Sequence, residues 1–438
     1  MEEEMRNKTL FVLLAIVLCV LVFTGCNRQS GQASSTANSS SVSAAVTLKW
    51  AMWDLNLTPY YGPLVEAYEA RNSNVKIELV DLGSQDFMTL LSTQLSGGAD
   101  LDILTIKDMP GYANLIRQNR LEPLSSFIRS QNINTDLYGG LTDQLMLNNE
   151  IYALPFRNDF WVVFYNKDLF DRAGVPYPTN DMSMEQYDAL ARRVTSGTGA
   201  NKTYGAHYHT WRSAVQLFGI LDGRHTVVDG NYDFLAPYYN MILKQQDDGI
   251  VQSYAQLRTS GTHYSGAFFN SQIAMLNMGA WFIPTQINNV ADGTASSKNW
   301  GLVKYPHPAG VPAGSTLATL TSLAVNANSR NKAAALEFMK FVSGPEGAAV
   351  VARTGSFPAI SNPEVVNIIS SMPGFPTDAN SREALNVYRS YLEIPIHERA
   401  ADIEVVLNEE HDAIMTKNIS VDQGIRNMNE RVGRILGR

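Results

Sequence analysis

The segment from Leu154 to Phe170 constrains the fold more than any other part of the chain. Within it, Phe160 to Tyr165 is a run of six apolar or aromatic residues. The run is rich in β-branched and aromatic types, so it predicts a strand buried on both faces of a sheet. Asn166 follows in the position of a helix cap, and Gly174 predicts where that short helix ends.

Three polar residues, Arg157, Asn158 and Asp159, stand directly before this buried strand. They separate it from Leu154–Phe156, which also favours a sheet. The residues alone leave two interpretations open. The triplet is an ordinary charged turn, or it is the place where the chain crosses between two lobes over a solvated cleft.

Strands and helices alternate before the triplet. Alternating side chains predict strands at 46–52 and 75–81, an apolar run predicts a third at 102–106, and helices are predicted at 61–71, 86–95 and 111–118. This order is typical of an α/β fold with a mostly parallel sheet. Because ligands bind at the carboxyl ends of such strands, we expect Trp53, Asp54 and Asp108 at the edge of a cleft.

The chain after the triplet is richer in helices. We predict helices at 184–194, 211–221, 235–247 and 331–342, and a strand at 320–325 that returns to the first lobe. Pro and Gly residues between Trp300 and Ser315 break regular structure, so we place a second crossing there. The last helix carries an apolar stripe from Val421 to Ile435, which predicts core packing.

The first 45 residues predict export and anchoring. Leu10–Phe23 is fourteen consecutive apolar residues, too short to span a bilayer but right for a signal peptide, which we place at 1–25. Thr24 and Gly25 precede Cys26 as in a bacterial lipobox, so we expect Cys26 to be lipidated. Residues 26–45 are mostly small and polar and predict a flexible tether. The only other cysteine, Cys19, lies in the signal core, so the mature chain has no disulfide.

Charge argues against one class of partner. The chain has 34 Lys and Arg against 42 Asp and Glu. An excess of acidic residues is unfavourable for binding nucleic acid or an anionic membrane surface. Aromatic residues make up 10% of the chain, which fits a globular protein with aromatic-lined surfaces.

Four sequence blocks in register resemble the extracellular solute-binding proteins of ABC importers, the family of sugar-binding lipoproteins that includes maltose-binding protein. They are Leu154-Pro155-Phe156 with Phe164-Tyr165-Asn166-Lys167-Asp168-Leu169-Phe170, Asp100 to Leu104, Phe269 to Met275 with Gly279-Ala280-Trp281, and Ala333 to Phe341. The resemblance runs from about residue 46 to the end. It implies that the triplet is the crossing between two lobes.

The resemblance also implies an architecture and a function. We expect a two-lobed periplasmic-binding-protein-like fold, with 46–157 and 309–355 in the N-terminal lobe and 158–308 and 356–438 in the C-terminal lobe. The protein is then a lipid-anchored, extracytoplasmic monomer. It captures a carbohydrate between its lobes and delivers it to ABC permease subunits.

Aromatic and polar residues are expected to share the binding of a sugar. An aromatic ring covers the apolar face of a pyranose, while carboxylate, amide and guanidinium groups bind its hydroxyls. We expect Trp53 and Trp281 to line the cleft from opposite lobes, with Asp159 as the acidic member of the site. The full set of predicted ligand-binding residues is Trp53, Asp54, Asp108, Arg157, Asn158, Asp159, His209, Trp211 and Trp281.

The sequence contains no convincing motif for chemistry. His397-Glu398 lacks the second histidine of a zinc-protease helix, no Gly-x-Ser-x-Gly elbow is present, and no histidine has clustered metal ligands. We therefore expect no catalysis, no cofactor and no metal. Two alternatives stay open: a secreted carbohydrate-active enzyme that uses two of Asp54, Asp108 and Asp159, and a binder of a peptide or polyamine, whose amines would meet these carboxylates.

Overall fold

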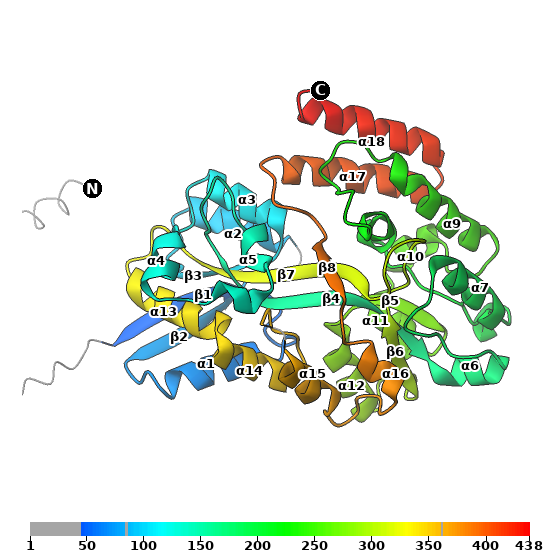
Figure 1. Ribbon diagram of the computed structural model, residues 1–438, viewed down its shortest axis with the longest axis horizontal. Helices are drawn as coiled ribbons and strands as arrows, with labels where there is room; N and C mark the ends of the chain where they lie inside the picture. The colour runs from blue at the N-terminus through cyan, green and yellow to red at the C-terminus, as the bar shows by residue number, and fades with distance from the viewer. Residues whose placement is uncertain (1–44, 84–85, 361) are drawn as a thin grey trace, which may run out of the picture. The chain divides into compact units, whose positions relative to one another are not determined.

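The structure is a computed structural model that describes residues 45–83, 86–360 and 362–438 (Figure 1). The predicted signal peptide, Cys26 and all of the predicted tether except Ala45 lie outside the described residues. Among the described residues, no helix is long and apolar enough to cross a membrane.

Eight strands are described, and they join into one sheet. In chain order they are β1 (Val46–Met52), β2 (Val75–Asp81), β3 (Ile103–Ile106), β4 (Leu154–Asn166), β5 (Met275–Gly279), β6 (Trp300–Lys304), β7 (Ser315–Val325) and β8 (Arg389–Leu392).

The helices of the described residues flank this sheet (Figure 1). They are α1 (Tyr61–Glu69), α2 (Phe87–Ser96), α3 (Met109–Arg117), α4 (Ser125–Ser130), α5 (Leu141–Gln144), α6 (Lys167–Ala173), α7 (Met184–Val194), α8 (Ser213–Gln216), α9 (Ala236–Asp247), α10 (Tyr254–Ser260), α11 (Tyr264–Phe269), α12 (Phe282–Ala291), α13 (Lys332–Ser343), α14 (Pro345–Arg353), α15 (Pro363–Ser370), α16 (Ala379–Glu383), α17 (Ala400–Met415) and α18 (Val421–Ile435).

The first lobe contains the predicted parallel strands. β1 lies between β2 and β3 and is parallel to both. β7 then adds to β3 in the antiparallel direction, with Ile103 opposite Val325. Two apolar cores cover the two faces, one around Tyr61 and Phe338 and the other around Phe87 and Tyr112.

β4 and β7 run side by side from one lobe to the other (Figure 1). The first half of β4 pairs with β7, so that Arg157 and Asp159 stand opposite Thr321 and Thr319. The second half pairs with β5 and β6. The polar triplet is therefore part of a continuous strand that belongs to both lobes, and it is not a charged turn.

The sheet of the second lobe differs from the prediction. β5 and β6 lie on either side of β4, and both are antiparallel to it. The expected parallel arrangement thus holds for the first lobe but is wrong for the second. The reason is the order of the chain: β5 and β6, which α12 connects, are parallel to each other, but the incoming strand β4 lies between them and runs antiparallel to both.

Two further predictions are corrected here. The predicted helix at 211–221 is a short α8 followed by a 3-10 turn, Leu217–Ile220. The strand predicted at 320–325 begins earlier, at Ser315. The second passage between lobes therefore lies within β7 and not in the loop before it, because the Thr- and Leu-rich run from 315 continues the ladder with β4. The predicted lobe boundaries remain a prediction.

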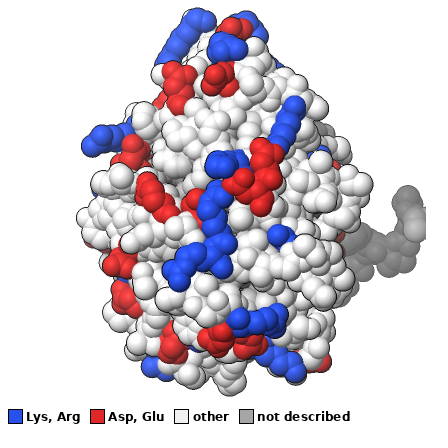
Figure 2. All heavy atoms as spheres, turned by 90° about the vertical axis from the view of Figure 1, so that its right-hand side faces the viewer, with Lys and Arg blue, Asp and Glu red and all other residues white. Residues whose placement is uncertain are grey.

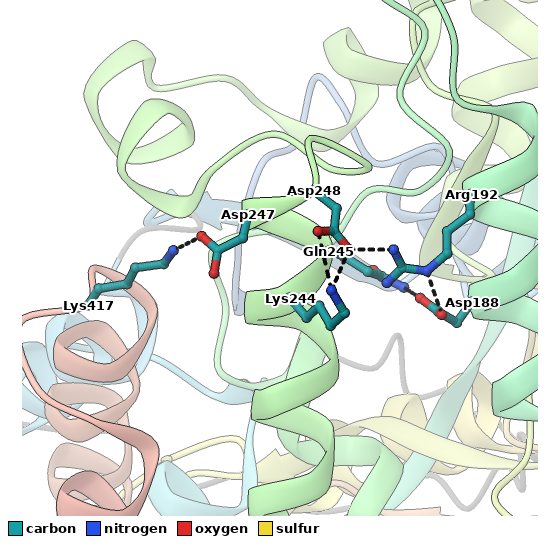
Figure 3. Close-up of polar contacts among 7 residues, drawn as sticks. All are labelled: Asp188, Arg192, Lys244, Gln245, Asp247, Asp248 and Lys417. Atoms are coloured by element: carbon teal, nitrogen blue, oxygen red, sulfur yellow. Dashed lines mark hydrogen bonds and ion pairs between the residues drawn. The ribbon is translucent and has the colours of Figure 1, made fainter.

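Paired charges join the helices on the outer side of the second lobe (Figure 3). Arg192 of α7 binds Asp188 at 2.8 Å and Asp248 at 2.5 Å, and Lys244 of α9 binds Asp248 at 3.0 Å. Lys417, in the turn after α17, pairs with Asp247. Figure 2 shows this face of the molecule, where basic and acidic side chains alternate. We call these residues, together with Gln245, the outer network.

Candidate functional site

Five aromatic side chains of the second lobe pack against one another beside the crossing strands. Trp281 lies 5.7 Å from Trp161 and 6.4 Å from Trp211, measured between ring centroids. Trp211 contacts His209 at 4.6 Å and Tyr264 at 5.6 Å. We call this set the aromatic group. Trp211 is 39% exposed, so part of the group is open to solvent.

Local sequence fixes the position of Trp281. It follows β5 and starts α12, and its Nε1 donates a hydrogen bond to Tyr264 Oη at 3.2 Å. Its indole lies directly over Gly279, where a Cβ would stand only 1.9 Å from the ring. Only glycine leaves room for the ring at this position, which explains the physical need for a Gly-x-Trp sequence.

Arg157 and Asp159 form a buried ion pair on the crossing strand β4. Their side chains point to the same face of the strand, since they are two residues apart. Arg157 also donates to Tyr60 Oη at 2.6 Å, and its guanidinium lies over the Tyr60 ring at 4.6 Å. Asp159 is 2% exposed. The pair thus ties β4 to the segment that follows β1.

Several buried polar atoms near this pair have no hydrogen-bond partner among the described residues. They are Asp159 Oδ1, Arg157 Nε, Thr319 Oγ1 and Trp161 Nε1. Thr319 stands opposite Asp159 in the sheet, and Trp161 is the next residue on the same face of β4. A buried polar atom without a partner costs about 1–3 kcal/mol. Several unpartnered polar atoms on one face of a sheet are typical of a binding site, where a polar ligand supplies the missing hydrogen bonds.

Asn158 is not part of this group. Because side chains alternate along a strand, it points to the opposite face of β4 from Arg157 and Asp159. There it lines a groove of about 1210 Å³ together with Phe160, Phe357 and Arg382. The three adjacent groups therefore do not share one face of the strand, and the assignment of Asn158 to the ligand site stays a prediction.

The first lobe contributes residues from the carboxyl ends of its strands. Trp53 follows β1, is partly buried against Phe87 at 5.0 Å, and lies beneath Lys107 Nζ at 5.4 Å. The backbone N–H of Asp54 donates to Asp81 Oδ1 at 3.0 Å. The charges of Asp54 and Asp159 help to raise the pKa of Tyr264 to about 12, after the larger effect of burial. The charges of Asp159 and Asp54 thus both act on the Tyr264 hydroxyl.

Asp108 has a structural task as well. Its side chain caps α3 by accepting from Gly111 N at 2.7 Å. Burial raises the pKa of the Asp108 carboxyl, and the charge of Glu404 in the second lobe raises it further. The Asp108 carboxyl thus has two influences on it, the hydrogen bond of the α3 cap and the negative charge of Glu404.

Three charged residues that the sequence did not single out are Arg212, Glu404 and Glu393. Arg212, next to Trp211, binds Glu404 with Nε to Oε1 at 2.8 Å and Nη2 to Oε2 at 2.5 Å. Glu393 follows β8, and its N–H donates to Ala318 O at 3.3 Å. Burial raises the pKa of Glu393 to about 7, with Arg212 opposing this and Glu404 and Asp108 adding to it. No local motif marks these residues, because three distant segments bring them together.

The imidazoles near the aromatic group are neutral. Burial lowers the pKa of His209 to about 4, and the neighbouring His263 adds to the effect. Burial likewise lowers the pKa of His207 to about 3. Among the described residues, no group of His, Cys, Asp and Glu could hold a metal ion. The polar side of the site therefore consists of carboxylates, guanidinium groups, hydroxyls and indole N–H groups.

Comparison with known proteins agrees with this fold. Residues 55–349 match the family described as bacterial extracellular solute-binding protein. A binding protein of Brucella abortus is 24% identical over 328 residues, which is 69% of this chain and 73% of that protein.

Solved structures are similar over nearly the whole described chain. A sugar transporter of Rhizobium etli in an open conformation is 58% identical, with a TM-score of 0.80, and the match covers 89% of this chain and 99% of that one. An ABC substrate-binding protein of Listeria monocytogenes in complex with cycloalternan is 21% identical, with a TM-score of 0.75 and coverage of 90% and 99%. The two-lobed α/β fold predicted from the sequence is confirmed, and the chain belongs to the bacterial extracellular solute-binding proteins.

Proposed function

We propose that this protein captures a carbohydrate between its lobes and delivers it to the permease of an ABC importer. The observation that carries the proposal is the aromatic group beside buried polar atoms that lack partners. A sugar supplies what this surface lacks: an apolar face for the indole rings, and hydroxyls that both donate and accept hydrogen bonds.

The relatives support a carbohydrate as the class of ligand. The Rhizobium etli protein, which is 58% identical, is described as a sugar transporter. The Listeria monocytogenes protein was crystallised with cycloalternan. The match to the former spans both lobes, so it includes all the elements that carry the aromatic group.

Seven of the nine predicted residues then have a distinct role. Trp281 and Trp211 stack on the ligand from the second lobe, and Trp53 does so from the first. Asp159, held in place by Arg157, accepts hydrogen bonds from ligand hydroxyls. Because Asp54 and Asp108 belong to the first lobe, their contacts with ligand form only when the lobes close, and closure is thereby coupled to binding.

The remaining parts of the proposal concern the cell. The mature chain is a monomer anchored by lipid at Cys26, and the tether of residues 26–45 lets the two lobes reach the permease. The lobes consist of 46–157 with 309–355, and of 158–308 with 356–438. The family to which the chain belongs consists of solute-binding proteins, and we propose that this member likewise performs no chemistry.

A thermal-shift screen of purified protein against a broad panel of sugars tests the function. A sugar present at ~100 times its Kd raises the free energy of unfolding by about 2.7 kcal/mol. The same samples, analysed for hydrolysis products, test the rival enzyme. Turnover of an oligosaccharide would contradict the proposal, as would stabilisation by peptides or polyamines but by no sugar.

Mass spectrometry of membrane-extracted protein tests the anchor. We expect an N-terminal Cys26 that carries acyl chains. A mature chain that begins elsewhere, for instance after Ala45, would show that Cys26 is removed. Cys26→Ala should release the protein from the membrane fraction without changing sugar affinity, because the tether lies outside the two lobes.

A further inference from the structure

The loop between β1 and α1, residues 53–60, is fastened to the neighbouring strand by a single carboxylate. Asp81, the last residue of β2, accepts hydrogen bonds with Oδ1 from Asp54 N at 3.0 Å and from Gly83 N at 2.9 Å. Its Oδ2 accepts from Leu55 N at 2.9 Å. Both oxygens of the carboxylate are therefore used by backbone N–H groups, and we call this set of three hydrogen bonds the Asp81 clamp.

The Asp81 clamp holds a backbone conformation that is uncommon for residues other than glycine. Asp54 has a φ of 50°, in the left-handed region, which residues with a Cβ enter only at an energetic cost. Hydrogen bonds to a charged acceptor are stronger than those between neutral groups, so the Asp81 carboxylate can offset that cost. Although burial raises the pKa of the Asp81 carboxyl, the three hydrogen bonds lower it below 3.8. The clamp is therefore ionised at neutral pH.

The opposite end of the same loop is fastened to the crossing strand. Tyr60, its last residue, is 2% exposed, and its Oη accepts a hydrogen bond from Arg157 at 2.6 Å. Arg157 is also the ion-pair partner of Asp159. The loop thus extends from the Asp81 clamp to the buried pair of β4, and both of its ends are held by charged side chains.

The clamped end of the loop carries two of the residues that we expect to bind ligand. Trp53 precedes Asp54 directly, and the centroid of its ring lies 5.0 Å from that of Phe87 and 5.4 Å from Lys107 Nζ. Both Trp53 and Asp54 are partly exposed. If Asp54 relaxed to a negative φ, its carboxylate would turn in a different direction and the chain on either side would shift. The orientation of both side chains therefore depends on Asp81.

We propose that Asp81 is a positioning residue for ligand capture. Without touching the ligand itself, it holds Trp53 and Asp54 in their binding orientation before a sugar arrives. The inference rests on the proposed function and deepens it, since it gives the first-lobe half of the site a preformed geometry. A preformed loop strengthens binding because less of the chain has to be ordered when the ligand binds.

Two variants remove the clamp in steps. Asp81→Ala deletes all three hydrogen bonds, whereas Asp81→Asn keeps one acceptor oxygen and loses the charge. Because Asp81 is exposed, both variants should fold. Titration calorimetry with maltotriose, cellotriose, mannobiose and cycloalternan measures the affinity. We expect binding about tenfold weaker in Asp81→Ala and about threefold weaker in Asp81→Asn, because a loop that leaves the binding orientation lowers the apparent affinity in proportion.

Hydrogen exchange of the ligand-free protein is a second measurement, because it reports on the loop without depending on a sugar. In Asp81→Ala, peptides that cover residues 53–57 should exchange at least about fivefold faster than in the parent protein. Asp292→Ala is the matched control, since Asp292 Oδ1 accepts from Thr294 N at 2.9 Å in the turn after α12 of the second lobe. It should change neither the sugar affinity nor the exchange of residues 53–57.

A double-mutant cycle separates positioning from general stability. Asp81 acts through Trp53 and Asp54, so the loss of affinity caused by Asp81→Ala should shrink to about threefold in a Trp53→Ala background. A merely stabilising residue would cause equal losses of affinity in both backgrounds, or a lower melting temperature with unchanged affinity. Either result would overturn the positioning role.

The outcomes keep this inference apart from the proposed function. Unchanged exchange of residues 53–57 in Asp81→Ala would overturn the clamp, whether or not a sugar binds. Faster exchange with unchanged affinity for a sugar that binds the parent protein would overturn the positioning role and leave carbohydrate capture intact. If no sugar binds the parent protein, the proposed function fails, and the positioning role fails with it.

Discussion

Two polar regions of the second lobe make opposite use of the same kinds of side chain. In the outer network, Arg192, Lys244 and Lys417 each meet an aspartate, and the buried Gln245 donates to Asp188 at 2.6 Å (Figure 3). Beside the aromatic group, Asp159 Oδ1 and Trp161 Nε1 are buried and lack partners. The charged groups of the outer network are all paired within the protein, although Gln245 Oε1 lacks a partner, whereas charged and polar atoms beside the aromatic group stay unpaired.

This difference separates residues that stabilise the fold from residues that can bind a ligand. An exposed ion pair contributes about 0–1 kcal/mol, because water competes for both charges. A buried polar atom without a partner destabilises the free protein, yet it strengthens binding of a ligand that supplies the missing hydrogen bond. The outer network can thus hold its helices together without taking part in ligand binding. The unpartnered polar atoms beside the aromatic group lower the stability of the free protein, and a bound ligand restores that stability.

The largest expected effect comes from breaking the buried pair. Asp159→Ala should lower the free energy of unfolding by about 3–5 kcal/mol, because the buried Arg157 guanidinium loses its counter-charge. Urea denaturation measures the change. The double variant Arg157→Met, Asp159→Leu should be less destabilised than the single one, because no buried charge is left unpaired. A smaller loss in the single variant would mean that Arg157 is better solvated than its burial indicates.

Removal of the central stacking ring should act on binding more than on stability. Trp281→Ala should weaken sugar binding by about 1–3 kcal/mol, if stacking on a sugar is comparable to stacking on a nucleobase. Trp300→Phe is the matched control, since Trp300 is buried against Phe164 in the second-lobe core. The control should melt at a lower temperature and bind normally. Normal binding by Trp281→Ala together with a much lower melting temperature would make Trp281 a core residue.

The two regions should also differ in their response to pH. Burial lowers the pKa of His207 to about 3, so the unfolded chain binds a proton there below pH 6.5 while the folded chain does not. Stability is therefore lost as pH falls from 6.5, by about 1.4 kcal/mol per pH unit for such a group. His207→Gln should flatten this part of the stability curve, followed by thermal melts from pH 7 to pH 5.

The outer network should respond only in stronger acid. Hydrogen bonds from Arg192, and then from Lys244, lower the pKa of Asp248 below its usual 3.8. Its contribution is thus complete above pH 4 and is lost as pH falls through the lowered pKa. Asp248→Asn should leave the curve above pH 5 parallel to that of the parent protein.

The smallest effect is expected from the exposed pair. Lys417→Ala removes the partner of Asp247, and both side chains are about half exposed. We expect a loss of less than about 1 kcal/mol that shrinks as salt is added, and no change in sugar affinity. A loss as large as that of Asp159→Ala would erase the distinction between the two regions.

The fold could be predicted because its signals are local. The alternation in β1 and β2, the cap at Asn166 and the stripe of α18 each depend on residues a few positions apart. The antiparallel second lobe had no such signal. A buried strand has the same composition whether its neighbours are parallel or antiparallel, and only the order of the connections decides.

The site was predictable only in part, for the same reason. Trp281 and Asp159 stand within sequence blocks that resemble a known family. Asn158 was assigned to the site because it is adjacent in sequence, yet the period of a strand turns it to the other face. Glu393, Glu404 and Arg212 lack any shared motif, since they lie after β8, on α17 and before α8, far apart in the sequence.

The strand pairing also dictates when the first lobe can be finished. β3 ends the parallel part of its sheet, and the strand that covers its edge is β7, more than two hundred residues later in the chain. As the chain emerges from amino to carboxyl end, the whole of β5 and β6 must therefore appear before the first lobe can close its sheet. Export of an unfolded chain, which the predicted signal peptide implies, would benefit from this late partner. The amino-terminal half of the chain cannot complete its sheet until most of the chain has been made. It therefore stays able to pass through a channel for longer.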